Sequence, residues 1–210
     1  MSKTKEKILL VQELINEDIL IFLGRNDLME CYYTLKEYMW EDKMDIKVIK
    51  ELDIKVSKHI IDKRNKEEFI IGLILNRIIE IYITEYFNNK KYVLVGSDKE
   101  KILTYNKTHY PDLLSKTDNS LLEVSSNYSL FAYNENEFAL RNNKLPYLID
   151  LSKNNKVQLI QISIPNRKYQ IIEINENTKY IFKEKLPAFG YKDCYCILFE
   201  ESNWKDFKIA

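Results

Sequence analysis

The stretch "HYPDLLSKTDNSLLEVSSNYS", residues 109–129, decides the fold that we expect for this chain. Two apolar runs flank "TDNS" (117–120), and Asp, Asn and Ser at these positions favour a turn. We therefore predict a β-hairpin, with Asp112 at the start of its first strand and Glu123 within its second. Because side chains alternate between the two faces of a sheet, the strand pairing decides whether these carboxylates share a side.

Two carboxylates on one side of a hairpin repel each other unless a cation neutralises them. A hard divalent ion with oxygen ligands, Mg²⁺ or Mn²⁺, is the natural partner. Such an ion can activate water and stabilise the charge that develops on a phosphate. The simpler interpretation is that Asp112 belongs to a turn and Glu123 faces solvent, and these two residues alone leave both interpretations open.

Toward the N-terminus the apolar spacing predicts helices. Gly24 suits the end of the first helix. Asn26 or Asp27 suits the N-cap of the second helix. Glu67 and Glu68 lie at the start of the last helix, where acidic side chains suit the helix dipole. That last helix contains an apolar stretch interrupted by polar residues, so we expect a buried helix and no membrane span. The predicted helices cover residues 5–24, 27–41, 45–62 and 66–88.

Toward the C-terminus the pattern changes to strands. The run 157–165 is continuously apolar, which predicts a central strand, and 144–154 predicts a helix with Pro146 in its first turn. Residues 130–143 show no clear pattern, and 178–186 fits a strand or a helix. Further strands are expected at 91–96, 169–174 and 194–201.

We therefore expect an α/β (α+β) fold in a single domain, residues 1–210. Its first part, 1–90, is mainly helical, and 91–210 forms a mixed sheet with one crossover helix. The 32 basic and 32 acidic residues cancel, so no overall charge attracts nucleic acid, although a local groove can still be basic. The three cysteines fit neither a disulfide framework nor a common zinc pattern, which favours a reducing compartment.

The pair "PD" (111–112), separated by ten residues from "EV" (123–124), resembles the motif of the PD-(D/E)xK nuclease superfamily. In that superfamily the aspartate and the second acidic residue hold metal, and a lysine usually follows two residues later. Here Ser125 stands in the lysine's place. The resemblance implies a nuclease-like mixed sheet and a metal-dependent endonuclease.

One branch of that superfamily takes its lysine from elsewhere. The cap-snatching endonucleases at the N-terminus of bunyavirus-like L polymerases carry a lysine on the helix after the hairpin. Lys144 in "NNKLPYL" matches it. The early segment "LGRNDLMECYYTL" (23–35) resembles one beginning Arg-His-Asp, with Asn26 at the position of a histidine ligand. The start of the long helix, "RNKEEFIIGLIL" (64–75), places Glu67 at the position of an acidic ligand.

The resemblance implies two bound ions, Mn²⁺ or Mg²⁺. Asp112 would contact both. Glu123, the carbonyl of Val124 and Asn26 would complete one site, and Glu67 would complete the other. Lys144 would stabilise the transition-state charge.

The implied substrate is single-stranded capped host mRNA, cleaved in the host cell cytoplasm to prime viral transcription. The implied partner is the rest of a viral polymerase chain. The isolated domain is expected to be a monomer, without a membrane association.

Several alternatives remain open from the sequence. Glu80, within the long helix, is the alternative to Glu67 as the helical ligand. His109 is expected to point away from Asp112, and His59 to lie on the surface. The alternative functions are a restriction-type DNA endonuclease of the same superfamily and a degenerate nuclease fold that acts as a binding module, which the residues at 26 and 125 favour.

Overall fold

The computed structural model describes residues 3–14, 26–41, 71–72, 74–76, 78–80, 82–83, 92–95, 110–128, 137–187, 192–200 and 203–206. Two helices, α1 (Lys3–Leu14) and α3 (Asn26–Glu41), come first, and helical turns follow between residues 71 and 83. The helix expected at 27–41 is therefore confirmed within one residue. The helix expected at 45–62 lies outside the described residues, as do the second half of 5–24 and the ends of 66–88.

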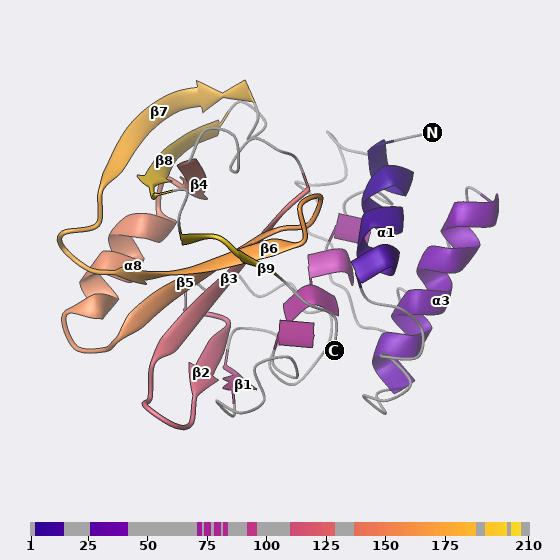
Figure 1. Cartoon of the computed structure of the whole chain (residues 1–210), viewed down its shortest axis with the longest axis horizontal. Helices are drawn as coiled ribbons and strands as arrows, with labels where there is room; N and C mark the ends of the chain where they lie inside the picture. The colour runs from indigo at the N-terminus through magenta and orange to yellow at the C-terminus, as the bar shows by residue number, and fades with distance from the viewer. Residues whose placement is uncertain are drawn as a thin grey trace, which may run out of the picture.

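A mixed sheet of six strands follows, in the order β1-β2-β3-β5-β6-β9 (Figure 1). The predicted hairpin is its β2 and β3, which pair antiparallel, whereas β3 and β5 run parallel. The predicted crossover helix, α8 (Lys144–Ser152), lies between β3 and β5 in the chain. The expected α/β class with a mixed sheet is thus confirmed. The strands are β1 (Tyr92–Leu94), β2 (Leu113–Ser115), β3 (Leu121–Asn127), β5 (Val157–Ser163), β6 (Lys168–Ile174) and β9 (Lys205–Asp206).

A second sheet of three antiparallel strands, in the order β4-β8-β7, was not expected. Its strands are β4 (Glu137–Arg141), β8 (Lys192–Leu198) and β7 (Tyr180–Leu186). The strand β4 lies within residues 130–143, for which the sequence showed no clear pattern and predicted no element. Three successive residues of β4, Phe138 to Leu140, are buried, so neither a period of two nor one of 3.6 is visible in its sequence.

The turn between β2 and β3 is held by Asp118. Its carboxylate accepts hydrogen bonds from the Ser120 hydroxyl at 2.7 Å and the Ser120 amide at 3.2 Å, and it pairs with Lys156 at 3.1 Å. The Ser115 amide closes the turn by donating to the Ser120 carbonyl at 2.9 Å. These bonds fix the register that pairs Leu113 with Leu122. The turn chemistry of "TDNS" therefore sets the relative positions of Asp112 and Glu123.

Replacing Asp118 with alanine should lower the free energy of unfolding by about 1 kcal/mol, the typical value of a lost hydrogen-bonding group that is partly exposed to solvent. The bonds from Ser120, Ser115 and Lys156 hold the pKa of Asp118 below its usual range. Its stabilisation is therefore present above the unfolded-state pKa and disappears as the pH falls below that value. Urea unfolding of both proteins at neutral pH and at about pH 3 measures this, and an equal difference at the two pH values would contradict it.

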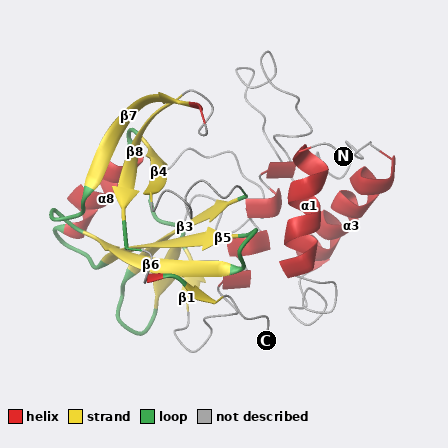
Figure 2. Cartoon of the chain, turned by 45° about the horizontal axis from the view of Figure 1, so that its top comes forward, coloured by secondary structure: helices red, strands yellow, loops and turns green. Residues whose placement is uncertain are grey.

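The six-stranded sheet is covered on both faces (Figures 1 and 2). On one face the helix-side cluster joins α1, α3 and the turns 71–83 to the sheet. Its members include Ile8, Leu35, Ile74, Ile78, Leu113, Leu122, Ile160 and Ile162. On the other face the α8-side cluster joins α8, β4 and β8 to the sheet. Its members include Leu121, Phe138, Leu145, Leu148, Val157, Leu159 and Ile197.

The strand β5 contributes to both clusters, which explains why apolar residues occupy both of its faces. It lies between β3 and β6, as expected for a central strand. Among the described residues, no helix is long and apolar enough to cross a membrane.

Candidate functional site

Asp112 lies directly before β2 and is fixed against β3. Its Oδ2 atom accepts a hydrogen bond from the amide of Val124 at 2.8 Å. On β3, Leu122 belongs to the helix-side cluster and Leu121 to the α8-side cluster, so Glu123 faces the α8 side by alternation. The alternation on β2 places Asp112 in phase with Leu114, which also packs against the α8-side cluster.

Lys144, the first residue of α8, contacts the carboxylate of Glu123. Its Nζ atom lies 2.7 Å from Oε2 of Glu123, and the two side chains are only 14% and 12% exposed. The helix is seated on the sheet by Leu145 and Leu148, which are fully buried. The pair is thus a largely buried ion pair whose geometry depends on how α8 packs.

The electrostatic environment of Glu123 is unfavourable for its charge. Burial raises the pKa of Glu123 well above its usual value, and the negative charge of Asp112 raises it further. Lys144 opposes both effects, whereas Glu80 adds a smaller upward shift of the pKa. The charges of Asp112, Lys144 and Glu80 therefore all influence the pKa of the buried Glu123 carboxyl group. Such strongly shifted pKa values are typical of functional sites.

Glu80 lies on the helical turns described between residues 71 and 83. One turn earlier on these turns, the Asn76 side-chain oxygen accepts a hydrogen bond from the Ser126 hydroxyl of β3 at 3.0 Å. Burial raises the pKa of the Tyr128 hydroxyl, and the charge of Glu80 raises it further. The Asn76 contact places these turns against the end of β3, on the helix side of the sheet. The charge of Glu80, the alternative helical carboxylate, influences the pKa of Glu123, and Glu67 lies outside the described residues.

The other candidate positions are less informative. Asn26 begins α3, and its side chain is outside the described residues, as are His59 and His109. Ser125, at the usual lysine position, is half-buried on β3. Val124 contributes its amide to Asp112, and its side chain packs against the helix-side cluster.

A pair of buried glutamines was missed by sequence reasoning. Gln161 lies opposite Ser125 in the parallel pairing of β3 and β5. Gln170 of β6 donates to the Gln161 side-chain oxygen at 2.8 Å, and both residues are fully buried. The signal was available, because two glutamines interrupt the apolar run "VQLIQIS" of β5. The two side-chain amides extend a row of polar side chains that includes Glu123 and Ser125 of β3.

The donor set suits a hard divalent cation. Among the described residues, no three His, Cys, Asp or Glu side chains are arranged as a ready metal-binding cluster, and Glu123 is engaged by Lys144. Asp112, Glu123 and Glu80 nevertheless offer only oxygen atoms, the ligands that Mg²⁺ and Mn²⁺ prefer. A cation placed among them would relieve the repulsion that raises the pKa of Glu123.

No protein-family model matches this sequence, and no curated protein or solved structure is significantly similar to it.

Proposed function

We propose that this chain is a divalent-metal-dependent endonuclease that hydrolyses phosphodiester bonds in single-stranded RNA. The observation that carries the proposal is the 2.7 Å contact between Lys144 and Glu123, with Asp112 held by a hydrogen bond at the start of the neighbouring strand. A lysine and two carboxylates that meet across a hairpin and the following helix form the constellation that the nuclease resemblance implies. The order hairpin, helix and parallel strand also agrees with a PD-(D/E)xK-like sheet.

Each side chain has a distinct role in this proposal. Asp112, Glu123 and Glu80 would hold Mn²⁺ or Mg²⁺, which supplies positive charge that acidifies water and stabilises a phosphate in the transition state. The amide of Val124 orients the Asp112 carboxylate, so that this ligand is ordered in advance. Lys144 brings a positive charge to the same point and stabilises the negative charge that develops on the phosphate.

The position of Lys144 supports an active enzyme over a degenerate one. The serine at position 125 leaves the usual lysine site without a charge, and α8 delivers an ammonium group to Glu123 instead. The buried pair is costly in an isolated fold, because both charges lose their hydration. Such a cost is understandable where the charges serve catalysis.

We further propose the biological setting that the resemblance implies. The substrate would be capped host mRNA in the cytoplasm, cleaved to prime viral transcription by a polymerase of which this chain forms a part. The zero net charge argues for local contacts with the strand, because no overall field attracts it.

Mn²⁺ should stabilise the folded protein. A ligand present at about 100 times its Kd, bound only by the folded state, adds about 2.7 kcal/mol. For a domain of this size that corresponds to a rise in Tm of about 5–10 °C. Differential scanning fluorimetry with Mn²⁺, Mg²⁺ or EDTA measures the rise, and Asp112→Asn should remove most of it. A wild-type Tm that is the same in Mn²⁺ and in EDTA would remove the basis for a metal-dependent enzyme.

A cleavage assay then separates the candidate substrates. Unstructured RNA, duplex RNA, single-stranded DNA and duplex DNA of one sequence are incubated with Mn²⁺. We expect internal cuts in the unstructured RNA. Preferential cleavage of duplex DNA would favour the restriction-type alternative, and metal binding without cleavage of any substrate would favour the binding module.

A further inference from the structure

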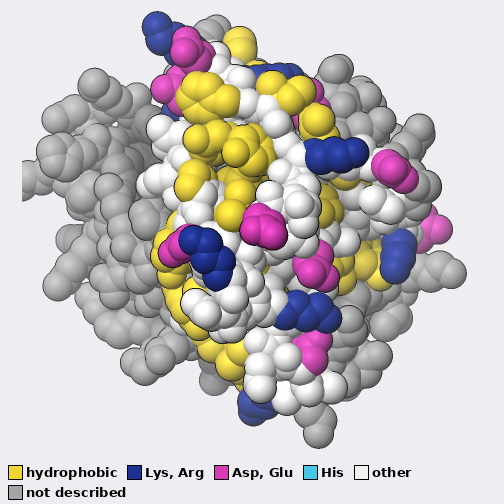
Figure 3. Space-filling view, turned by 90° about the vertical axis from the view of Figure 1, so that its left-hand side faces the viewer, with side chains coloured by type: hydrophobic (Ala, Val, Ile, Leu, Met, Phe, Trp, Pro, Cys, Tyr) yellow, Lys and Arg dark blue, Asp and Glu magenta, His cyan; other side chains and the backbone are white. Residues whose placement is uncertain are grey.

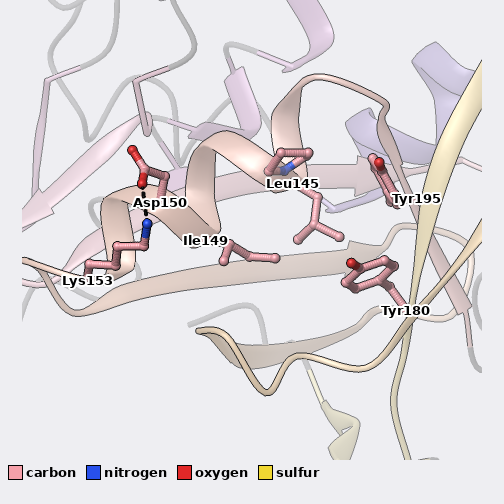
Figure 4. A pocket seen from close by; sticks show the side chains of 7 residues that line it. Leu145, Ile149, Asp150, Lys153, Tyr180 and Tyr195 are labelled. Atoms are coloured by element: carbon pink, nitrogen blue, oxygen red, sulfur yellow. Dashed lines mark hydrogen bonds and ion pairs between the residues drawn. The ribbon is translucent and has the colours of Figure 1, made fainter.

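A groove lies on the outer side of α8, beside the candidate site. It has a volume of about 340 Å³ and is open to solvent at the surface between α8 and the strands β7 and β8 (Figure 4). One stripe of α8 forms its floor, because residues 146, 149, 150 and 153 follow helical spacing. The lining residues are Leu145, Pro146, Ile149, Asp150, Lys153, Tyr180 and Tyr195.

Aromatic rings form the wall opposite the helix. Tyr180 of β7 packs edge-to-face on Tyr195 of β8, with ring centroids 5.1 Å apart, and Phe182 lies 5.2 Å from the same ring. Tyr180 and Phe182 are 46% and 47% exposed, which is unusual for large aromatic side chains. Figure 3, which views the side of the molecule that carries β7 and α8, shows hydrophobic side chains gathered in a patch bordered by charged ones.

The groove and the candidate catalytic site share the first turn of α8. Leu145 directly follows Lys144, the residue that contacts Glu123. At a rise of 1.5 Å per residue, Ile149 lies about 8 Å farther along the helix axis than Lys144. A flexible strand whose phosphate lies at Glu123 spans this distance within a few nucleotides.

The chemistry of the lining matches an unpaired nucleobase. A base has a flat aromatic face and an edge of hydrogen-bond donors and acceptors, and unpaired bases stack on tyrosine rings in RNA-binding proteins. The exposed Asp150 and Lys153, paired at 2.8 Å, place an acceptor and a donor at the rim. The groove thus offers ring faces for the base and opposite charges for its edge and phosphate.

We propose that this groove binds one unpaired base of the substrate strand, stacked on Tyr180, a few nucleotides from the bond that is cleaved. The identity of the ligand as RNA rests on the nuclease function proposed above. The position of the base in the groove rests on the lining residues, of which Leu145 and Pro146 lie in the first turn of α8 together with Lys144.

Binding of an unstructured, fluorescently labelled RNA oligonucleotide tests this proposal. Fluorescence anisotropy in EDTA reports binding without cleavage. Tyr180→Ala should weaken binding about tenfold, within the range for loss of one base–aromatic stack. Tyr180→Phe keeps the ring and should bind as wild type does. The matched control is Tyr33→Ala, because Tyr33 is 51% exposed and lies on α3, at the other end of the molecule (Figure 2).

An abasic scan locates the base. Oligonucleotides that lack one base at a time should lose affinity for the wild-type protein at one position, and Tyr180→Ala should be insensitive to the loss at that position. Equal binding by wild type and Tyr180→Ala, or no RNA binding by wild type, would overturn the proposal. Unchanged RNA binding with altered self-association of Tyr180→Ala in sedimentation would also overturn it, because the patch would then pair two copies.

The same measurements separate the two proposals. Metal-dependent cleavage by wild type that is unaffected by Tyr180→Ala, together with unchanged binding, would leave the nuclease function standing without the base groove. Binding that depends on Tyr180, without cleavage in Mn²⁺, would leave the base groove standing and overturn the nuclease function.

Discussion

Replacing Glu123 with glutamine should reduce Mn²⁺-dependent cleavage of RNA by about 10³-fold, the upper end of the range for loss of one electrostatic group in an active site. The substitution keeps the size of the side chain and removes its charge, so that a proposed metal ligand is weakened without opening a cavity. It also removes the partner of Lys144, whose Nζ atom lies 2.7 Å from Oε2 of Glu123. Initial rates with a labelled RNA, at saturating Mn²⁺, measure the effect.

The matched control for this substitution is Glu173→Gln. Glu173 lies on β6 of the same sheet and is exposed. It is therefore a glutamate on a strand, as Glu123 is, but it lies outside the candidate site. Its variant should cleave as wild type does. If Glu123→Gln retains wild-type cleavage while both variants remain folded by circular dichroism, Glu123 has no part in catalysis and the proposed site is wrong.

Replacing Lys144 with methionine should lower the free energy of unfolding by about 3 kcal/mol at neutral pH, because breaking a buried ion pair leaves the other charge uncompensated. Glu123 then keeps its burial and the negative charge of Asp112, both of which raise its pKa, and loses the ammonium group that lowers it. Methionine fills the space of the lysine stem, so the effect is mainly electrostatic. Urea unfolding in EDTA measures the change without a contribution from metal.

The destabilisation by Lys144→Met should depend on pH. A carboxyl group whose pKa is raised in the folded state binds a proton more tightly there than in the unfolded chain. Its stabilising contribution is therefore complete below the unfolded-state pKa and is lost as the pH rises through the raised value. The variant should approach wild-type stability at about pH 4, near the ordinary pKa of glutamate.

The double variant Glu123→Gln with Lys144→Met serves as the control for this prediction. With both charges absent, most of the lost stability should return, and the difference between pH 4 and pH 8 should shrink. A double variant that is as unstable as Lys144→Met alone would show that the loss comes from packing of α8 rather than from the ion pair.

Local signals predicted the elements that are specified by neighbouring residues. The sequence "TDNS" predicted the turn because Asp118 bonds to a serine two residues away. The helices α3 and α8 and the strand β5 were predicted from apolar spacing and run length. In each of these elements the residues that define it are close together in the chain.

Two strands of the smaller sheet show the limit of such signals. Tyr180, Ile181 and Phe182 of β7 are exposed, so no alternation of buried and exposed residues distinguished a strand from a helix. The pairing with β8, the next strand, and the ion pair between Lys183 and Glu137, which are 46 residues apart, hold β7 in place. The strand β4 was missed because β8 and α8 bury its residues together.

The sequence by itself determined the hairpin, the helix that begins at Lys144, and the candidates Asp112, Glu123 and Glu80. Only the tertiary structure decided that Lys144 reaches Glu123, and that tyrosines of β7 and β8 line a groove along α8. The physical reason is that turns and periodic patterns depend on bonds between near neighbours. The meeting of side chains from distant segments depends on strand register and on the buried contacts that seat each helix on the sheet.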